Sequence, residues 1–138
     1  MTPESVVCVY NWKTATKIVN RNDFSLDWWK KEEIIAQELR CNAMAALGSG
    51  PVNACLSDIS LTASDRLQGA ASNALDRAGI FDVGLSKSIA GSAAVAVNHA
   101  ALALAAGCTG DHSFAAKFRL FQAGRWPLGI YKEVFYVF

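Results

Sequence analysis

Residues 86–106 read SKSIAGSAAVAVNHAALALAA, and this stretch carries a single charge, Lys87, close to its start. Most of the other residues are alanine, valine, leucine and isoleucine, and Gly107, a typical helix terminator, follows directly. The stretch therefore predicts a helix over residues 86–106. Because apolar residues cover all of its faces, we expect it to be buried almost all round and packed closely by its neighbours through small side chains.

The same stretch is long enough to cross a membrane, which takes roughly 20 residues. Ser88, Ser92, Asn98 and His99 are scattered through it, however, and most of its apolar residues are alanines. Alanine contributes little to membrane insertion, and buried Asn and His side chains oppose it. We therefore favour the central helix of a soluble domain, with no membrane partner.

Apolar spacing on either side predicts three further helices, over residues 25–47, 52–78 and 113–123. Ser25 is the expected cap of the first, with Asp27 in its first turn. The sequence does not decide whether the second helix is interrupted near residues 60–62. Ser64 is the expected cap of the part that follows. Each predicted helix is followed by glycine, as helix ends commonly are.

The two ends of the chain differ in character from its middle. Thr2-Pro3-Glu4 is typical of a helix start and predicts a helix from Pro3 to about Val19, although the β-branched run makes a strand over residues 6–10 an open alternative. Residues 124–138, GRWPLGIYKEVFYVF, predict a β-hairpin. We therefore expect one domain over residues 1–138: a mainly α bundle of four to five helices around a central Ala-rich helix, with a small C-terminal β-hairpin.

Hydrophobic residues make up 52% of the 138 residues and charged residues only 18%, which argues against disorder. The net charge of +1 excludes a global field that would steer nucleic acid or an acidic membrane to the chain. The charge is uneven, however, with +2 over residues 1–22, −4 over residues 23–85 and +3 over residues 86–138. The middle of the chain is therefore acidic and both ends are basic.

The four cysteines, Cys8, Cys41, Cys55 and Cys108, lie far apart with no spacing typical of a metal site. We interpret them as free thiols in a reducing compartment, with Cys41 and Cys55 buried among small apolar residues. The N-terminus lacks the pattern of a signal peptide, which favours a cytoplasmic location. The sequence predicts no cofactor and no metal.

Cys108-Thr109-Gly110-Asp111-His112-Ser113 gathers several reactive residue types, so a small enzyme using this loop is one functional alternative. Adjacent residues rarely converge on one point, as a catalytic triad requires. We favour a loop that ends in a helix cap, with Asp111 or Ser113 holding the start of the last helix. We interpret His99, inside the Ala-rich helix, as a core histidine with its hydrogen bonds satisfied rather than a ligand or base.

The C-terminal stretch GRWPLGIYKEVFYVF and the helical stretch AVNHAALALAAG, residues 96–107, resemble segments of small bacterial immunity proteins. These proteins belong to contact-dependent growth inhibition and related polymorphic toxin systems. The resemblance implies a cytoplasmic, α-helical protein that is not an enzyme. It would act through protein–protein interaction, by binding and neutralising a cognate toxin domain. A membrane-associated helical partner protein is the remaining alternative.

If the toxin is a nuclease, its nucleic-acid site is basic, and the immunity protein needs a local acidic patch. The acidic middle of the chain supplies the candidate toxin-binding residues, with a tryptophan as an apolar anchor: Trp28, Trp29, Glu32, Glu33, Asp58, Asp65, Asp76 and Asp82. The alternative for each acid is that it solvates a helix face or favours a helix N-terminus. The oligomeric state is left open.

Overall fold

The computed structural model describes residues 5–19, 32–131 and 134–138 of the chain. Within these ranges the chain forms five helices and three strands. In chain order they are β1 (Ser5–Cys8), α1 (Trp12–Val19), α2 (Glu33–Leu47), α3 (Ser49–Arg77), α4 (Val83–Ala105), α5 (Ser113–Gln122), β2 (Pro127–Tyr131) and β3 (Val134–Val137).

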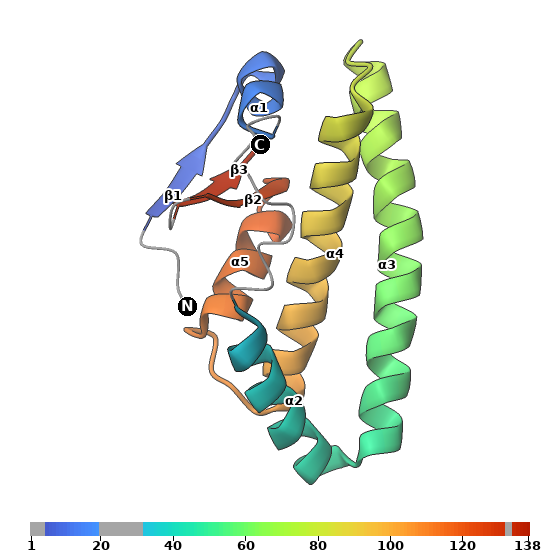
Figure 1. The fold of residues 1–138 in the computed structure, drawn as a ribbon, viewed down its shortest axis with the longest axis vertical. Helices are drawn as coiled ribbons and strands as arrows, with labels where there is room; N and C mark the ends of the chain where they lie inside the picture. The colour runs from blue at the N-terminus through green and yellow to red at the C-terminus, as the bar shows by residue number, and fades with distance from the viewer. Residues whose placement is uncertain (1–4, 20–31, 132–133) are drawn as a thin grey trace.

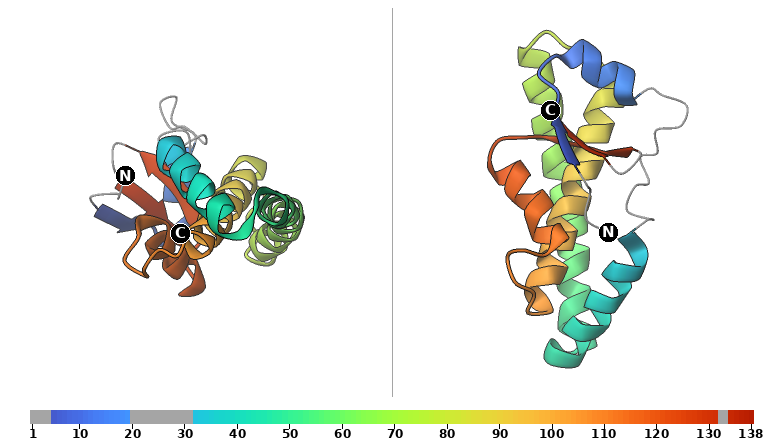
Figure 2. Two further views of the ribbon diagram at one scale, coloured as in Figure 1. Left: turned by 90° about the horizontal axis from the view of Figure 1, so that it is seen from below. Right: turned by 90° about the vertical axis from the view of Figure 1, so that its left-hand side faces the viewer.

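The centre of the fold is α4, which contacts α1, α2, α3, α5 and β2. The two longest helices, α3 and α4, lie side by side as a hairpin (Figure 1). The sheet and α5 lie on the side of α4 that faces away from α3, and α2 crosses the lower end of the hairpin (Figures 1 and 2). The mainly α class and the bundle around the Ala-rich helix are thereby confirmed.

Local signals determine both ends of α4. Asp82 is the N-cap, and its carboxylate accepts hydrogen bonds from the Leu85 amide at 3.0 Å and from the Thr16 hydroxyl of α1 at 2.8 Å. After the helix, Gly107 adopts a φ of +75°, and the Cys108 amide donates back to the Ala103 carbonyl at 2.9 Å. This left-handed residue turns the chain sharply away, as in a Schellman motif.

The termini meet in one small sheet of order β1-β3-β2. β2 and β3 pair antiparallel, which confirms the predicted hairpin, and β1 adds to β3 in parallel. The Val9 amide extends the pairing by donating to the Val137 carbonyl at 2.8 Å. Trp126 and Phe138 close the end of the hairpin with two backbone hydrogen bonds of 2.8 and 2.7 Å.

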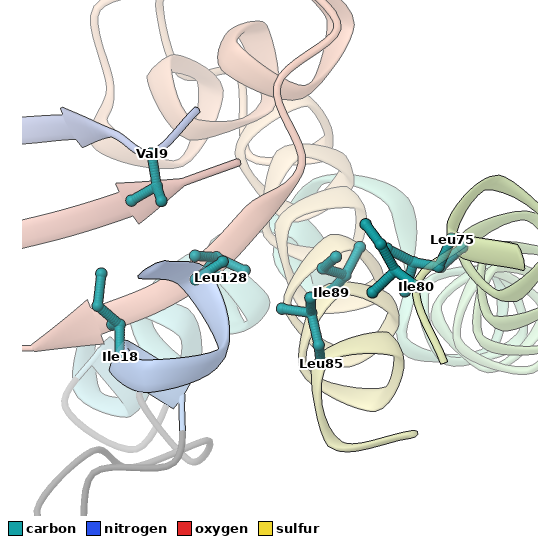
Figure 3. Packing of buried hydrophobic residues seen from close by; sticks show 9 residues of the cluster. Val9, Ile18, Leu75, Ile80, Leu85, Ile89 and Leu128 are labelled. Carbon is teal, nitrogen blue, oxygen red and sulfur yellow. The ribbon is translucent and has the colours of Figure 1, made fainter. Parts of the chain in front are cut away.

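The largest core cluster lies between this sheet, α1 and the upper parts of α3 and α4 (Figure 3). Leu85 and Ile89 of α4 lie between Leu128 of β2 and Leu75 of α3 (Figure 3). The full cluster comprises Val9, Ala15, Ile18, Ala71, Leu75, Ile80, Leu85, Ile89 and Leu128. Residues from both ends of the chain and from both long helices are therefore buried together.

The serines of α4 that argued against a membrane span form hydrogen bonds inside this domain. The hydroxyls of Ser88 and Ser92 both donate to the Leu128 carbonyl, at 3.1 and 2.6 Å. The Ser86 hydroxyl lies 3.0 Å from that of Ser72 in α3. Because a buried hydroxyl is costly unless it is hydrogen-bonded, these contacts explain how an apolar core helix tolerates serine.

Two predictions for the first half of the chain were wrong. A single helix over residues 3–19 does not form, because β1 precedes α1, so the open strand alternative was closer to the structure. α3 runs unbroken from Ser49 to Arg77, with Ser64 in its interior rather than at a cap. Gly48, at a φ of +90°, separates α2 from α3, and the predicted cap Ser25 lies outside the described residues.

The start of α5 also differs in detail from the prediction. Its N-cap is His112, whose Nδ1 accepts a hydrogen bond from the Phe114 amide at 3.2 Å, rather than Asp111 or Ser113. The Ser113 side chain is buried, and Asp111 is exposed. Imidazole can accept this bond through its unprotonated nitrogen, so it replaces the commoner hydroxyl or carboxylate cap.

We expect Asp82→Ala to lower the free energy of unfolding by about 1–2 kcal/mol, because it removes both the cap of α4 and the acceptor of the Thr16 hydroxyl. Guanidinium unfolding monitored by circular dichroism measures the change. Thr16→Val is the matched control, because it removes only the link to α1. If Asp82→Ala costs no more than Thr16→Val, the cap does not contribute as described.

Candidate functional site

Three titratable side chains from distant parts of the chain meet inside the bundle. Glu32 directly precedes α2, His99 lies in the middle of α4, and Lys117 lies in α5. Their exposed fractions are 1%, 6% and 2%. We call these three residues the buried ionic cluster.

The carboxylate of Glu32 contacts both other members of the buried ionic cluster. The Lys117 ammonium donates a hydrogen bond to Oε1 of Glu32, and Nδ1 of His99 lies 3.6 Å from Oε2 of the same carboxylate. The His99 ring stacks on Phe114 with centroids 3.9 Å apart and an interplanar angle of 12°. Nζ of Lys117 lies 5.4 Å from the centre of the same phenyl ring, within the range of a cation–π contact.

Burial governs the protonation of this cluster. It lowers the pKa of His99 to about 3, and the positive charge of Lys117 acts in the same direction. His99 is therefore neutral near pH 7. Burial also lowers the pKa of Lys117, while the charge and hydrogen bond of Glu32 oppose that decrease. The cluster thus holds a neutral imidazole beside an ion pair.

Sequence reasoning missed the buried ionic cluster as a unit. His99 was interpreted as a core histidine, and its burial agrees with that interpretation. Glu32, in contrast, was predicted to lie on the surface, and the sequence analysis assigned no role to Lys117. One local signal was available. Lys117 follows Phe114 by three residues, so the two share a face of α5, and that face is the buried one.

An open groove of about 590 Å³ lies beside His99, between α2, α3 and α4. Arg40 and Gln37 of α2 and Asn98 of α4 are among its polar side chains, and the Asn98 amide donates to the Ser60 hydroxyl at 3.1 Å. The groove is lined by Glu33, Ala36, Gln37, Arg40, Ser60, Ser64, Gly91, Ala94, Val95, Asn98, His99 and Leu102. We call it the His99 groove.

The buried ionic cluster is better suited to holding helices together than to chemistry. Its charged atoms are enclosed by protein, and His99 is the member that also lines the groove. A buried ion pair that joins the start of α2 to α5, with His99 of α4 beside it, fixes how these three elements meet. The cluster therefore positions the wall of the His99 groove that α2 forms.

The predicted toxin-binding acids separate into two groups in the structure. Asp58, Asp65 and Asp76 are all exposed on α3, and Glu33 is exposed at the start of α2, where it lines the His99 groove. The successive spacings on α3 are seven and eleven residues, about two and three helical turns, so these three carboxylates lie along one side of that helix. Asp58, Asp65 and Asp76 therefore form a row about 27 Å long on one side of α3.

The remaining predicted residues do not join this side of α3. Glu32 is buried and paired with Lys117, so no partner can contact it without breaking the cluster. Asp82 is half-buried, and its carboxylate is engaged as the cap of α4. Trp28 and Trp29 lie outside the described residues.

The loop from Cys108 to Ser113 does not assemble into a triad. Nδ1 of His112 is used in capping α5, Asp111 is exposed and Ser113 is buried. Among the hydrogen bonds between described residues, none joins Cys108 or Ser113 to the His112 ring. These residues instead form the turn that precedes α5, and His112 caps that helix.

The cysteines are free, as predicted, but their burial differs from the prediction. Cys41 and Cys55 are exposed on α2 and α3, while Cys8 and Cys108 are half-buried. The small apolar residues around Cys41 and Cys55 therefore do not form a core there. The described ranges contain no group of three His, Cys, Asp or Glu side chains that could hold a metal ion.

Among the described helices, only α4 has the length and apolar composition needed to cross a membrane, and half of its most apolar window is buried inside the domain. Core helices of soluble proteins share these properties. Comparison of the chain with protein-family models, with curated proteins and with solved structures gives no match.

Proposed function

We propose that this protein is an immunity protein that binds and neutralises a cognate toxin domain, possessing no activity of its own, in the bacterial cytoplasm. The observation that carries the proposal is the acidic side of α3, formed by Asp58, Asp65 and Asp76, together with an exposed aromatic residue in the turn that follows the helix. The resemblance of residues 124–138 and 96–107 to immunity proteins supports the choice of a toxin as the partner.

The aromatic residue is Phe81, in the turn between α3 and α4, with an exposed fraction of 84%. Val83, two residues later, is 70% exposed. Large aromatic side chains are enriched among the residues that dominate binding energy at protein interfaces. Phe81 is therefore a candidate for the apolar anchor, a role that the sequence suggested for Trp28 or Trp29.

Charge explains why a toxin surface fits this side of α3. A nuclease domain must be basic where it contacts phosphate groups, because those contacts dominate its affinity for nucleic acid. A complementary acidic surface accelerates association with such a domain and would cover its nucleic-acid site. Since the chain as a whole carries only +1, this complementarity has to be local, and α3 supplies it.

We expect charge reversal at both Asp65 and Asp76 to lysine to weaken binding of the toxin domain at least about tenfold. The toxin domain used is the one encoded by the neighbouring reading frame, and affinity is measured by calorimetry at two salt concentrations. The loss should be larger at low salt and should come mainly from a slower association rate, because salt screens exposed charges. Phe81→Ala should instead accelerate dissociation.

The matched control reverses two exposed acids outside α3, Glu38→Lys with Asp111→Lys, which changes the net charge by the same amount. This variant should bind far more tightly than the α3 variant. Equal loss in both variants would show a general charge effect. Wild-type binding by the α3 variant with its fold intact would place the interface elsewhere, and failure of the wild-type chain to bind the toxin would reject the proposed function.

A further inference from the structure

A second groove, of about 480 Å³, opens between α3 and α4. It is lined by Asp58, Ile59, Thr62, Ala63, Arg66, Leu67 and Val97. All of these residues except Val97 belong to α3. We call it the α3–α4 groove.

The middle of α3 is covered poorly for a helix of this length. From Asn53 to Ala70 the helix contains no fully buried residue, although it has buried residues on both sides of this segment, at Val52 and Ala71. Within the segment, Ile59, Ala63 and Leu67 recur every four residues and are only half-buried. This is an apolar helix face that the domain itself covers incompletely.

The charges on this face are arranged symmetrically about one residue. Asp58 precedes Thr62 by four residues and Arg66 follows it by four, so opposite charges lie at equal distances on either side. Eight residues of helix separate Asp58 from Arg66 by about 12 Å, too far for a direct ion pair. Neither forms a salt bridge with another described residue.

Such an arrangement is self-complementary. If a second α3 lies antiparallel across the first, with a two-fold axis passing near Thr62, then Asp58 of each copy faces Arg66 of the other. Ile59 and Leu67 are centred on Ala63, the next residue of the helix, so an axis that passes between Thr62 and Ala63 also brings Ile59 of each copy close to Leu67 of the other. A two-fold interface requires this reciprocity, in which each surface matches itself.

We propose that two copies of this chain associate through the α3–α4 groove, with their α3 helices antiparallel and a two-fold axis near Thr62. The occupant of the groove is then the α3 helix of the second copy. Apolar contact comes from Ile59, Ala63 and Leu67, and the paired charges determine the antiparallel register. This inference does not rest on the proposed function, and it is tested with the chain alone, without a toxin. Asp58 belongs to both surfaces, so the second copy and a toxin would compete for this end of the acidic side of α3.

The first test is a charge swap between Asp58 and Arg66, both of which are exposed. Asp58→Arg and Arg66→Asp each place like charges opposite one another twice per dimer, so each should raise the dimer dissociation constant at least about tenfold. The double variant Asp58→Arg/Arg66→Asp restores opposite charges and should dimerise almost as tightly as the wild type. Sedimentation equilibrium measures all four chains, with circular dichroism to verify the fold.

Three outcomes would overturn the proposal. The wild-type chain could remain monomeric at the highest attainable concentration, the single variants could dimerise like the wild type, or the double variant could remain as weak as the single variants. In each case the groove would not join two copies in the stated register. Recovery in the double variant, by contrast, requires that the two positions face one another.

A second test locates the axis directly. Thr62→Cys, in a chain whose exposed Cys41 and Cys55 are replaced by serine, should form a disulfide with its own counterpart, because a residue on a two-fold axis lies beside itself. The matched control is Ser64→Cys in the same background, because Ser64 lines the His99 groove on another side of α3. Cross-linking at Thr62 but not at Ser64 supports the proposal, and any other pattern contradicts it.

Discussion

Replacing Lys117 by methionine is expected to lower the free energy of unfolding by about 3–5 kcal/mol, because the change leaves the buried carboxylate of Glu32 without the ammonium that neutralises it. For a chain of this size, this corresponds to a decrease in Tm on the order of 10 °C. Urea unfolding followed by circular dichroism measures the free energy. Methionine fills nearly the same space, so most of the loss comes from the charge and little from a cavity.

Two control variants separate the buried charge from packing. The double variant Glu32→Gln/Lys117→Met removes both charges and should recover at least half of the lost stability, because no uncompensated charge remains buried. Lys87→Met, at an exposed position on α4, should change stability by less than about 0.5 kcal/mol. If Lys117→Met resembles Lys87→Met, the ion pair does not hold α2 and α5 together as described.

The stability of the wild-type protein is expected to decrease as the pH is lowered from 6.5 to 4.5, by about 2 kcal/mol from His99 alone. The pKa of His99 is about 3 in the folded chain, against 6.5 for the unperturbed side chain. Between these values the unfolded chain binds a proton that the folded chain does not, so acid favours unfolding. One pKa unit corresponds to about 1.4 kcal/mol, and because the unfolded side chain is only half protonated at pH 6.5, the two pH units together contribute about 2 kcal/mol.

This pH dependence belongs to one residue and can be removed with it. His99→Gln should flatten the decrease between pH 6.5 and 4.5, whereas His112→Gln, at the other of the two histidines, should retain it. Proton NMR offers a second measurement that does not need a variant, because the His99 ring signals should show no titration between pH 5 and 8. A transition of those signals near pH 6.5 would show that burial does not hold the imidazole neutral.

The buried ionic cluster also bears on the two binding surfaces. It joins the start of α2 to α5 with His99 of α4 alongside, and α2 packs against both α3 and α4. Loss of the cluster would therefore disturb the His99 groove before it disturbed the upper core around Leu85 and Leu128, which shares no residue with the cluster. The acidic side of α3 and the α3–α4 groove depend instead on the long hairpin of α3 and α4.

Much of the helical structure could be predicted because its signals are local. The apolar run from Ser86, the stop at Gly107 and the glycine after α5 each act within a few residues of the element that they end. The hairpin of β2 and β3 could be predicted for the same reason, since its strands are close in sequence. The start of the chain was harder, because β1 pairs with β3 at the opposite end of the sequence.

The candidate site was predicted only in part, because burial depends on distant neighbours. Glu32 resembles a solvated acid in the sequence, yet its partner Lys117 lies 85 residues further along the chain. Asp82 resembles a surface acid as well, but α1 covers it through Thr16. Asp58, Asp65 and Asp76 are exposed on α3 although that helix packs against α2 and α4, and which side of α3 these helices cover is set by the tertiary structure.

By itself, the sequence determined the helical class, the C-terminal ends of α4 and α5, and the hairpin, since glycines and apolar periodicity act over one or two turns of chain. Only the tertiary structure decided that the two termini share a sheet, that Glu32, His99 and Lys117 meet in the interior, and that α3 exposes its acids and half of an apolar face. The physical reason is that burial, ion pairing and sheet order depend on contacts between residues far apart in sequence. A local sequence pattern does not indicate which of those residues come into contact.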